Sequence, residues 1–465
     1  MLLSPKDEDP SLPEPPSSPW RTKAKIAARR SSNIKRCAII VASLAFCVPI
    51  FLLLNSTNTI YDSARWVPTT TNNDTLNTLS IPSERLDTPL PLPSPAESPL
   101  VNTTKEVPVS PIAFSLIMYS ENSAAEGAIL VKSILMYTSV PVEVHIICDD
   151  SARTYLERRI SLVKHPRNNV LIRFYNLQFH QMLARIEREG AITTDHSAGI
   201  PGLMKLFIHE ILPTSVKKSI FIDTDAFFIS DPSLLWNHFN SLDPNIAISM
   251  PTHMEQSAPE WHNANRICSC IMLLDLDKLR KLRLMDSINY RNHPGGTEAL
   301  SPPAFRDMFG PPGPTGHYED VKLGDQGYWW AIVSFRKEIF EHLSFDWEVS
   351  SCLMDMYMTG LGNDDATEQD EIAVQLHTWE TVHQGQAILP KLVHFNCLDG
   401  VDRYYEWSGW SDPSNSLAKR WSATLNYHVG YKWLWLNQAS TNDTILTIET
   451  VQDVIFLDES STEPS

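Results

Sequence analysis

The chain has 465 residues, enough for one large domain or two ordinary ones. Hydrophobic residues make up 43% of it and charged residues 20%, as in an ordinary globular protein. The formal net charge of -17 excludes a protein that binds nucleic acid through its phosphates, because such a protein needs a basic surface to displace counterions.

An apolar run near the N-terminus predicts a membrane anchor. Residues 37–54, CAIIVASLAFCVPIFLLL, contain no charge and reach the lower length limit for a helix that crosses a bilayer. Seven Lys and Arg residues precede the run between positions 21 and 36 with no acid among them, so the positive-inside rule places the N-terminus in the cytosol. A cleaved signal peptide is the alternative, but the length of the run and the long polar leader favour an anchor.

These features predict a single-pass type II protein of the Golgi or ER membrane. Residues 1–36 form a cytosolic tail, 37–54 the transmembrane signal-anchor, and the polar, proline-rich residues 55–110 a disordered stem that cannot bury a core. Residues 111–435 form a lumenal globular domain, and 436–465 a polar C-terminal tail. All N-x-S/T sequons fall on the predicted lumenal side, at Asn55, Asn73, Asn102 and Asn442.

Five of the seven cysteines also fall on the predicted lumenal side. They are Cys148, Cys268, Cys270, Cys352 and Cys397. An oxidising lumen permits two disulfides with one thiol left over, and the sequence does not assign the partners. The C-x-C pair at 268–270 lacks a second pair at zinc-finger spacing, so we expect these cysteines to be buried or bridged.

From Pro111 onward, short apolar runs alternate with segments of helical periodicity. Strands are predicted for IAFSLIMYS, VEVHIICDD, NVLIRFYNL, SIFIDTD and AISM, helices for AEGAILVKSILMYT and PGLMKLFIHEIL, and a strand running into a helix for CIMLLDLDKLRKL. Such alternation indicates βαβ units. It therefore predicts an α/β fold with a mostly parallel central sheet flanked by helices on both faces, an architecture typical of nucleotide-binding proteins.

Two aspartates at the end of one predicted strand suggest a metal site. Asp223 and Asp225 follow the apolar residues SIFI, and side chains two apart on an extended strand point the same way. Ligands of open α/β sheets bind at the carboxyl ends of strands. A bound divalent cation removes the repulsion between two such anions, and carboxylate oxygens suit Mn or Mg.

The D-x-D pair has two other interpretations. In the first, one aspartate caps the following turn and the other is merely exposed. In the second, the pair belongs to a haloacid-dehalogenase phosphatase, whose motif has Thr or Val where this chain has Phe227. That difference, together with the predicted lumenal setting, disfavours a phosphatase.

The segment SIFIDTDAFFISDPSLLW resembles the D-x-D segment of glycosyltransferase family 8, the retaining enzymes that include glycogenin, glucoside xylosyltransferases and LARGE-like proteins. MKLF, CSCIMLLDLDKLR, LGDQGYWWAI, FDWEVSSC and LVHFNC agree with the family in order, over roughly residues 112–397. The resemblance implies a GT-A fold, a requirement for Mn, a UDP-sugar donor and, as in many Golgi members, a type II anchor.

The resemblance also implies roles for residues around the diphosphate. Asp223 and Asp225 would hold the metal against the diphosphate of the UDP-sugar, with Thr224 near the ribose. His394 matches the third metal ligand of the family, although a lone His after an apolar strand is by itself more typical of a core residue. Lys205 in MKLF matches a family Lys near the nucleotide sugar. The alternative is that Lys205 is an ordinary solvent-exposed lysine on a helix surface.

Other implied roles concern the base and the donor sugar. Met118, Tyr119 and Ser120 at the end of the first strand would line the uracil base and ribose, unless Met118 is simply core. Ser269 matches a serine that the family has in its donor site. Asp325 in LGDQG would bind hydroxyls of the donor sugar and Gln326 would lie at the anomeric carbon.

The chain departs from the family at several positions. Cys268 stands where relatives have an Asn that contacts the sugar, Cys270 where they have a Gly, and Asn396 replaces a Gly after the metal-binding His. The family's nearby phosphate-binding Lys is missing, and Arg403 is a candidate substitute. Aromatic residues farther on could stack on acceptor sugars, and Trp407 and Trp410 are the candidates for this.

The sequence therefore predicts a metal-dependent retaining glycosyltransferase that moves a sugar from a UDP-sugar to a glycan or glycoprotein acceptor. The alternative is a catalytically silent carbohydrate-binding or scaffolding protein that keeps the same fold. The predicted partners are the donor, the acceptor and, through one N-terminal helix, the membrane, but not nucleic acid.

Overall fold

A computed structural model of the chain describes residues 110–252, 258–292, 298–354, 388–398, 403–439 and 443–460. All of them belong to one compact unit, Asn102–Ser465. No helix within these ranges is long and apolar enough to cross a membrane, and the predicted anchor at 37–54 lies outside them together with the tail and the stem.

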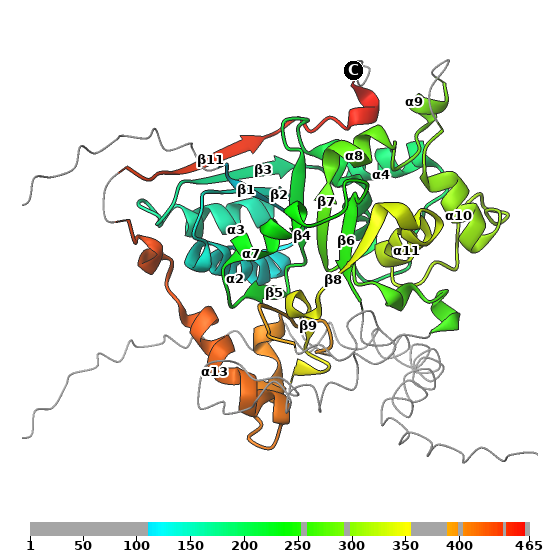
Figure 1. Cartoon of the computed structure of the whole chain (residues 1–465). Coiled ribbons are helices and arrows are strands. Elements are labelled where there is room, and N and C mark those ends of the chain that lie inside the picture. Colours follow the sequence, from blue (N-terminus) through cyan, green and yellow to red (C-terminus); the bar gives the residue numbers. More distant parts are fainter. Residues whose placement is uncertain are drawn as a thin grey trace, which may run out of the picture. The chain divides into compact units, whose positions relative to one another are not determined.

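The described residues are built around an eight-stranded sheet (Figure 1), with strand order β11-β3-β2-β1-β4-β7-β6-β8. Its strands are β1 (Ile112–Met118), β2 (Val142–Cys148), β3 (Val170–Asn176), β4 (Lys218–Ile222), β6 (Ile248–Pro251), β7 (Ile271–Asp275), β8 (Phe340–Leu343) and β11 (Leu446–Val451). Strands β11, β3, β2, β1 and β4 are parallel, and β7 runs antiparallel to both of its neighbours. The predicted mostly parallel sheet is therefore confirmed.

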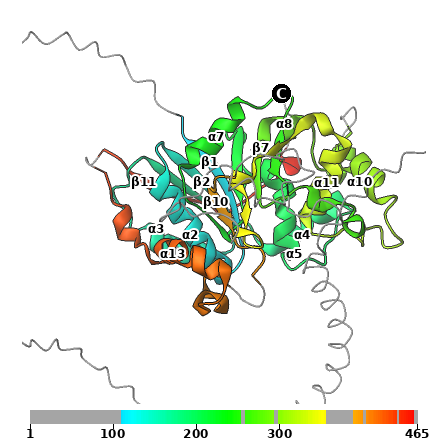
Figure 2. The ribbon, with the colours of Figure 1, turned by 60° about the horizontal axis from the view of Figure 1, so that its bottom comes forward.

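Helices cover both faces of this sheet. They are α2 (Glu121–Tyr137), α3 (Asp150–Ile160), α4 (Phe179–Glu189), α5 (Gly199–Leu203), α6 (Ile208–Ile211), α7 (Pro232–Asn237), α8 (Leu276–Lys281), α9 (Ile288–Arg291), α10 (Ser301–Phe309), α11 (Asp325–Phe335) and α13 (Ser416–Gly430). Figure 2 shows α2, α3 and α13 gathered on one side, and α4, α5, α10 and α11 on the other. Strand β1 contributes Phe114 to the first side and Ala113 to the second, which explains why its sequence is apolar almost without interruption.

A second, three-stranded sheet continues from the end of β4. It consists of β5 (Ala226–Phe228), β10 (Leu392–His394) and β9 (Val349–Ser350), with β10 in the middle. Antiparallel pairing of β10 with β5 places His394 opposite Ala226, the residue that follows the D-x-D pair. The small sheet thus brings together two chain segments that are far apart in sequence.

The prediction of a polar tail over residues 436–465 is wrong for its described part. Residues 446–451 form β11, which extends the main sheet by parallel pairing with β3. Beyond the strand, Phe456 is buried in the core and Asp458 pairs with Arg188 at 2.7 Å. The segment looked polar because β11 is an edge strand whose side chains are only half-buried or exposed.

The described cysteines form two disulfides, Cys268–Cys270 and Cys352–Cys397, and leave the buried Cys148 as a free thiol. This confirms the expectation that the cysteines are buried or bridged.

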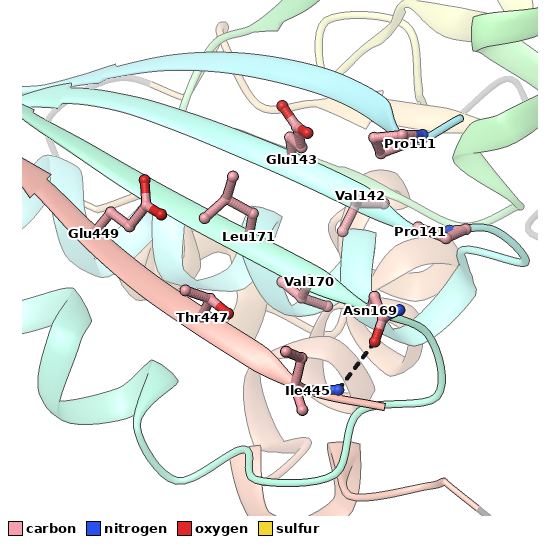
Figure 3. Close-up of a pocket in the computed structure, with 10 residues that line it drawn as sticks. All are labelled: Pro111, Pro141, Val142, Glu143, Asn169, Val170, Leu171, Ile445, Thr447 and Glu449. Atoms are coloured by element: carbon pink, nitrogen blue, oxygen red, sulfur yellow. Dashed lines mark hydrogen bonds between the residues drawn. The ribbon is translucent and has the colours of Figure 1, made fainter. Parts of the chain in front are cut away.

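A surface hollow of about 430 Å³ lies where β1, β2, β3 and β11 begin (Figure 3). It is lined by Pro111, Pro141, Val142, Glu143, Asn169, Val170, Leu171, Ile445, Thr447 and Glu449. The hollow is at the amino ends of the parallel strands, whereas ligands of open α/β sheets bind at the carboxyl ends. A ligand site is therefore expected at the opposite, carboxyl ends of these strands.

Candidate metal and nucleotide-sugar site

The two aspartates lie at the carboxyl end of β4, as the sequence predicted. Backbone hydrogen bonds fix each of them: the amide of Asp223 donates to the carbonyl of Cys270 at 2.8 Å, and the amide of Phe395 donates to the carbonyl of Asp225 at 2.9 Å. Their side chains are 28% and 29% exposed, so the carboxylates are partly sheltered yet reachable from solvent. This is the position in which a ligand of an α/β sheet is expected.

His394 completes a three-residue group with the aspartates. Its Nε2 lies 3.3 Å from Oδ1 of Asp225, and the ligand atoms of Asp223, Asp225 and His394 all lie within 4.8 Å of one another. On its other side, Nδ1 lies 3.2 Å from Oε1 of the buried Glu348. Two carboxylate oxygens and one imidazole nitrogen suit a cation such as Mn²⁺, so the residues present fit the predicted metal.

Lys205 joins this group to a third aspartate. It lies in a short 3₁₀ turn (Met204–Phe207) between α5 and α6, with Nζ 2.8 Å from Oδ1 of Asp223 and 3.6 Å from Oδ1 of Asp325. Nζ also donates to the carbonyl oxygen of Ser269 at 3.4 Å. Burial lowers the pKa of Lys205, but the charges of Asp223 and Asp325 outweigh burial and raise it. Lys205 is therefore a charged residue inside the site rather than a surface cation.

The charges around the candidate metal-ligand group, which consists of Asp223, Asp225 and His394, balance one another. Burial raises the pKa of Asp223, against the opposing charge of Lys205. Burial acts in the same direction on Asp225, but the charge and the hydrogen bond of His394 hold the pKa of Asp225 below its usual value. Burial lowers the pKa of His394, yet Asp225 and Glu348 together raise it to about 10. Each carboxylate thus has a positive neighbour within the protein.

Asp325 and Gln326 open helix α11. Gly324, just before the helix, has φ +60, a left-handed conformation that favours glycine. Burial raises the pKa of Asp325 to about 6, although the charge of Lys205 opposes this. Gln326 is held at both ends: its Nε2 donates to the carbonyl of Ala264 at 3.0 Å, and its Oε1 accepts from the amide of Ser269 at 3.4 Å. Asp325, Gln326 and Ser269 therefore lie together beside Lys205.

The last residue of β1, Met118, and the two residues after it lie at the same end of the sheet, but their side chains are engaged in other contacts. Met118 is fully buried, and a Cβ on Gly127 would come within 2.2 Å of its Cε, so Met118 packs under α2. The hydroxyl of Tyr119 donates to the carbonyl of Leu177 at 2.9 Å, and burial raises the pKa of this tyrosine. The hydroxyl of Ser120 accepts from the amide of Ser123 and caps α2.

Thr224, between the two aspartates, also faces α2. A Cβ on Gly127 would lie 3.4 Å from its Cγ2, so the methyl group packs toward the helix. Its side chain is half-buried.

Three further candidates have other partners. Arg403 pairs with Glu406 at 2.6 Å rather than with the metal-ligand group. Trp407 and Trp410 pack edge to face with ring centroids 5.3 Å apart, and Nε1 of Trp410 donates to the carbonyl of Tyr404 at 2.8 Å. Both tryptophans are half-buried against the hydrophobic cluster below the small sheet, so they contribute mainly to packing.

Two acidic residues near the group have no predicted role. Glu348 lies behind His394, and Glu126 of α2 accepts from the amide of Tyr404 at 2.7 Å. Burial raises the pKa of Glu126 to about 8, and the charge of Asp225 adds to this rise. FDWEVSSC contains Glu348, but the parallel pairing of β9 with β10 that brings it to His394 has no local sequence signal. Glu126 lies in the helical segment AEGAILVKSILMYT and carries no signal of its own.

No family model matches the chain. The rat (Rattus norvegicus) xylosyl- and glucuronyltransferase LARGE2 is 29% identical over 151 residues, which cover 32% of this chain and 20% of the relative. The human (Homo sapiens) LARGE2 is 28% identical over 180 residues, which cover 36% of this chain and 23% of the relative. The chain thus spans only about a fifth of the length of these relatives.

Among solved structures, mouse xyloside xylosyltransferase 1 aligns with a TM-score of 0.43 and 14% identity, covering 63% of this chain and 100% of that one. The resemblance that the motifs predicted is confirmed: over about a third of its length, the chain is similar to LARGE-type glycosyltransferases of family 8.

Proposed function

We propose that the chain is a metal-dependent retaining glycosyltransferase with a GT-A fold, which moves a sugar from a UDP-sugar to a glycan or glycoprotein. The observation that carries this proposal is the group formed by Asp223, Asp225 and His394, whose ligand atoms lie within 4.8 Å of one another at the carboxyl end of β4. Lys205 adjoins this group through Asp223, and Asp325 in turn adjoins Lys205. Support also comes from the sequence similarity to enzymes named xylosyl- and glucuronyltransferases.

The proposed chemistry divides the work between a cation and the protein. Asp223, Asp225 and His394 would hold a divalent ion, which would supply the positive charge that stabilises a departing diphosphate. Glu348 holds the imidazole of His394 in orientation from the opposite side.

Lys205 has a second role in this proposal. Its ammonium group lies between Asp223 and Asp325 and adds a fixed positive charge next to the diphosphate. Because Lys205 and the metal share Asp223, loss of the lysine charge would also alter metal binding.

Donor recognition is assigned to the residues on the α11 side. Asp325 is buried at the helix start, where its carboxylate can accept hydrogen bonds from sugar hydroxyls. The family resemblance supports a role at the reacting carbon for Gln326, which Ala264 and Ser269 hold in place. Uridine contacts from residues 118–120 would come mainly from the backbone, because their side chains are engaged elsewhere.

The setting of the enzyme is part of the proposal. We infer a single-pass type II protein of the Golgi or ER membrane, anchored by residues 37–54 with the catalytic domain in the lumen. Two disulfides among the described residues agree with an oxidising compartment.

The test is a donor screen with the purified protein and Mn²⁺. Release of UDP is measured with UDP-glucose, UDP-xylose, UDP-galactose, UDP-N-acetylglucosamine and UDP-glucuronic acid, and we expect turnover with at least one. Asp223→Asn combined with Asp225→Asn should abolish both turnover and Mn²⁺-dependent binding of UDP. Asp320→Asn, at a side chain that is 97% exposed, is the matched control and should change neither. Failure of every donor, together with no Mn²⁺-dependent binding of UDP, would overturn the proposal.

A further inference from the structure

A second set of potential metal ligands lies next to the first. Ligand atoms of Cys268, Cys270, Glu348 and His394 all lie within 4.8 Å of one another, and all four residues are buried. In the structure the two sulfurs are joined in a disulfide, so they are not available as ligands in this state.

The stability of the fold does not explain the Cys268–Cys270 disulfide. A disulfide stabilises mainly by restricting the unfolded chain, and it does so more when the loop it closes is longer. Cys268 and Cys270 are two residues apart, whereas the other disulfide, Cys352–Cys397, joins residues 45 apart. The shorter bridge therefore restricts the unfolded chain far less than the longer one.

The position of the pair connects it to the site. Ser269, between the two cysteines, donates its amide to Gln326 and accepts from Lys205 through its carbonyl. The carbonyl of Cys270 accepts from the amide of Asp223. The two sulfur atoms are therefore attached to backbone that contacts both the metal side and the donor side of the site.

We propose that reduction of this disulfide creates a second metal site, made of the Cys268 and Cys270 thiolates, the Glu348 carboxylate and the His394 imidazole, which binds Zn²⁺. Thiolates and imidazole are the ligands that Zn²⁺ prefers, and four protein ligands are typical of its tetrahedral sites. Mn²⁺ prefers oxygen ligands and has a better match in the Asp223, Asp225 and His394 group.

The chemistry of this change balances with a dithiol as reductant. The dithiol gives two electrons and two protons to the disulfide; the S–S bond breaks, two thiols form, and the reductant becomes a disulfide. When Zn²⁺ then binds, the two thiols release their protons and each sulfur supplies an electron pair to the metal.

His394 belongs to both groups, with Nε2 toward Asp225 and Nδ1 toward Glu348. Because a neutral imidazole has one nitrogen with a free electron pair and one N–H, it binds one cation at a time, so occupancy of one site opposes occupancy of the other. In the oxidised state the protein would have only the site for a hard cation such as Mn²⁺. In the reduced state the thiolate site would compete with it for His394. This competition rests on the proposed function, whereas the thiolate site itself does not.

Co²⁺ is the probe, because it replaces Zn²⁺ and gives a thiolate-to-metal charge-transfer band in the near ultraviolet. The full-length protein is reduced with dithiothreitol, freed of the reductant without air, and titrated with Co²⁺ alone. We expect one equivalent of Co²⁺ to bind with this band in the reduced protein, and no band in the oxidised protein.

Variants assign the ligands. Cys268→Ser and Cys270→Ser should each weaken the band, and together they should remove it. The matched control is Cys352→Ser with Cys397→Ser, which removes the other reducible pair and should leave the band intact. Oxidised and reduced wild-type protein remain comparable even if a variant fails to fold. Absence of the band in the reduced wild type, or its persistence in the Cys268 and Cys270 double variant, overturns the proposal.

A competition experiment tests the sharing of His394. The experiment is done in buffer without Mg²⁺. Excess Mn²⁺ together with UDP should lower the intensity of the cobalt band of the reduced protein at least tenfold more than UDP alone does. A band that is unchanged by Mn²⁺, in a protein that binds Mn²⁺ when oxidised, would refute the sharing. Failure of the oxidised protein to bind Mn²⁺ would instead count against the proposed function, while the cobalt band would still decide the thiolate site.

Discussion

Glu348 offers a specific test of the proposed metal site, because it contacts the proposed ligand His394 and is not itself a proposed ligand of that site. We predict that Glu348→Gln weakens Mn²⁺ binding by the oxidised protein while leaving the fold intact. Gln has nearly the same shape as Glu, and its Oε1 can still accept a hydrogen bond from Nδ1 of His394. The substitution therefore removes the charge and keeps the contact.

The size of the effect follows from the geometry. Oε1 of Glu348 lies 3.2 Å from Nδ1 of His394. Two full charges at that separation interact by roughly 5 kcal/mol at an effective dielectric constant of about 20. A metal-bound imidazole is a dipole rather than a full charge, so the loss is smaller. Removing a carboxylate that orients a ligating histidine typically lowers metal affinity about 10- to 100-fold, which is about 1.4–2.7 kcal/mol.

The assay is a Mn²⁺ titration of the oxidised protein, followed by the electron paramagnetic resonance of free Mn²⁺. Glu341→Gln is the matched control, because Glu341 is exposed on β8 in the same part of the chain, and it should leave the affinity unchanged. A folded Glu348→Gln protein with the affinity of the wild type would refute the assigned role of Glu348.

Three further predictions concern stability. Burial lowers the pKa of His428 to about 4, below its value of 6.5 in an unfolded chain, so the folded state binds fewer protons. The contribution of this pKa shift to the free energy of unfolding is complete above about pH 6.5 and is lost as the pH falls toward 4. Between pH 7.5 and 5.5, the free energy of unfolding in urea should therefore fall by roughly 1 kcal/mol less in His428→Gln than in the wild type. Glu210→Gln leaves the fully buried guanidinium of Arg185 without its bidentate partner, at 2.6 Å and 2.7 Å, and should cost about 3–5 kcal/mol in urea unfolding. Cys352→Ser with Cys397→Ser opens a loop between residues 45 apart and should cost roughly 4 kcal/mol, measured in the same way.

Each of these predictions has an outcome that contradicts it. Equal pH dependence in the wild type and in His428→Gln would mean that this histidine has the same pKa in the folded and unfolded states. A Glu210→Gln protein as stable as the wild type would mean that Arg185 finds other acceptors. Unchanged stability without the longer disulfide would mean that the unfolded chain is already restricted in that region.

Much of the main sheet could be predicted because its strands are buried on both faces. In β1 and β4 nearly every side chain is buried, and this is what an uninterrupted apolar run signals. Strand β11 escaped prediction for the opposite reason: it lies at the edge, its side chains are half-buried or exposed, and its partner β3 is far away in sequence. Its pairing gains an ion pair between Arg173 and Glu449 at 2.8 Å, which is visible only once both strands are in register.

The site divides in a similar way. The rule that ligands bind at the carboxyl ends of strands was enough to select Asp223 and Asp225. His394 was selected by resemblance, since a single histidine after an apolar strand has no distinctive pattern. Glu348 was missed because its contact depends on the pairing of β9 with β10 in the small sheet. The part of the site that could not be predicted from the sequence is thus the part that depends on pairing between distant segments, not on residue type.

The late position of β11 in the sequence affects folding during synthesis. Glu449 pairs with Arg173, which precedes it by 276 residues. At about 5–20 residues per second, a ribosome needs roughly 14–55 seconds to make that interval. Throughout this time β3 has no partner on its outer side and presents a free strand edge, which is a template for aggregation. Protection of β3 until β11 emerges would therefore limit aggregation of the nascent chain.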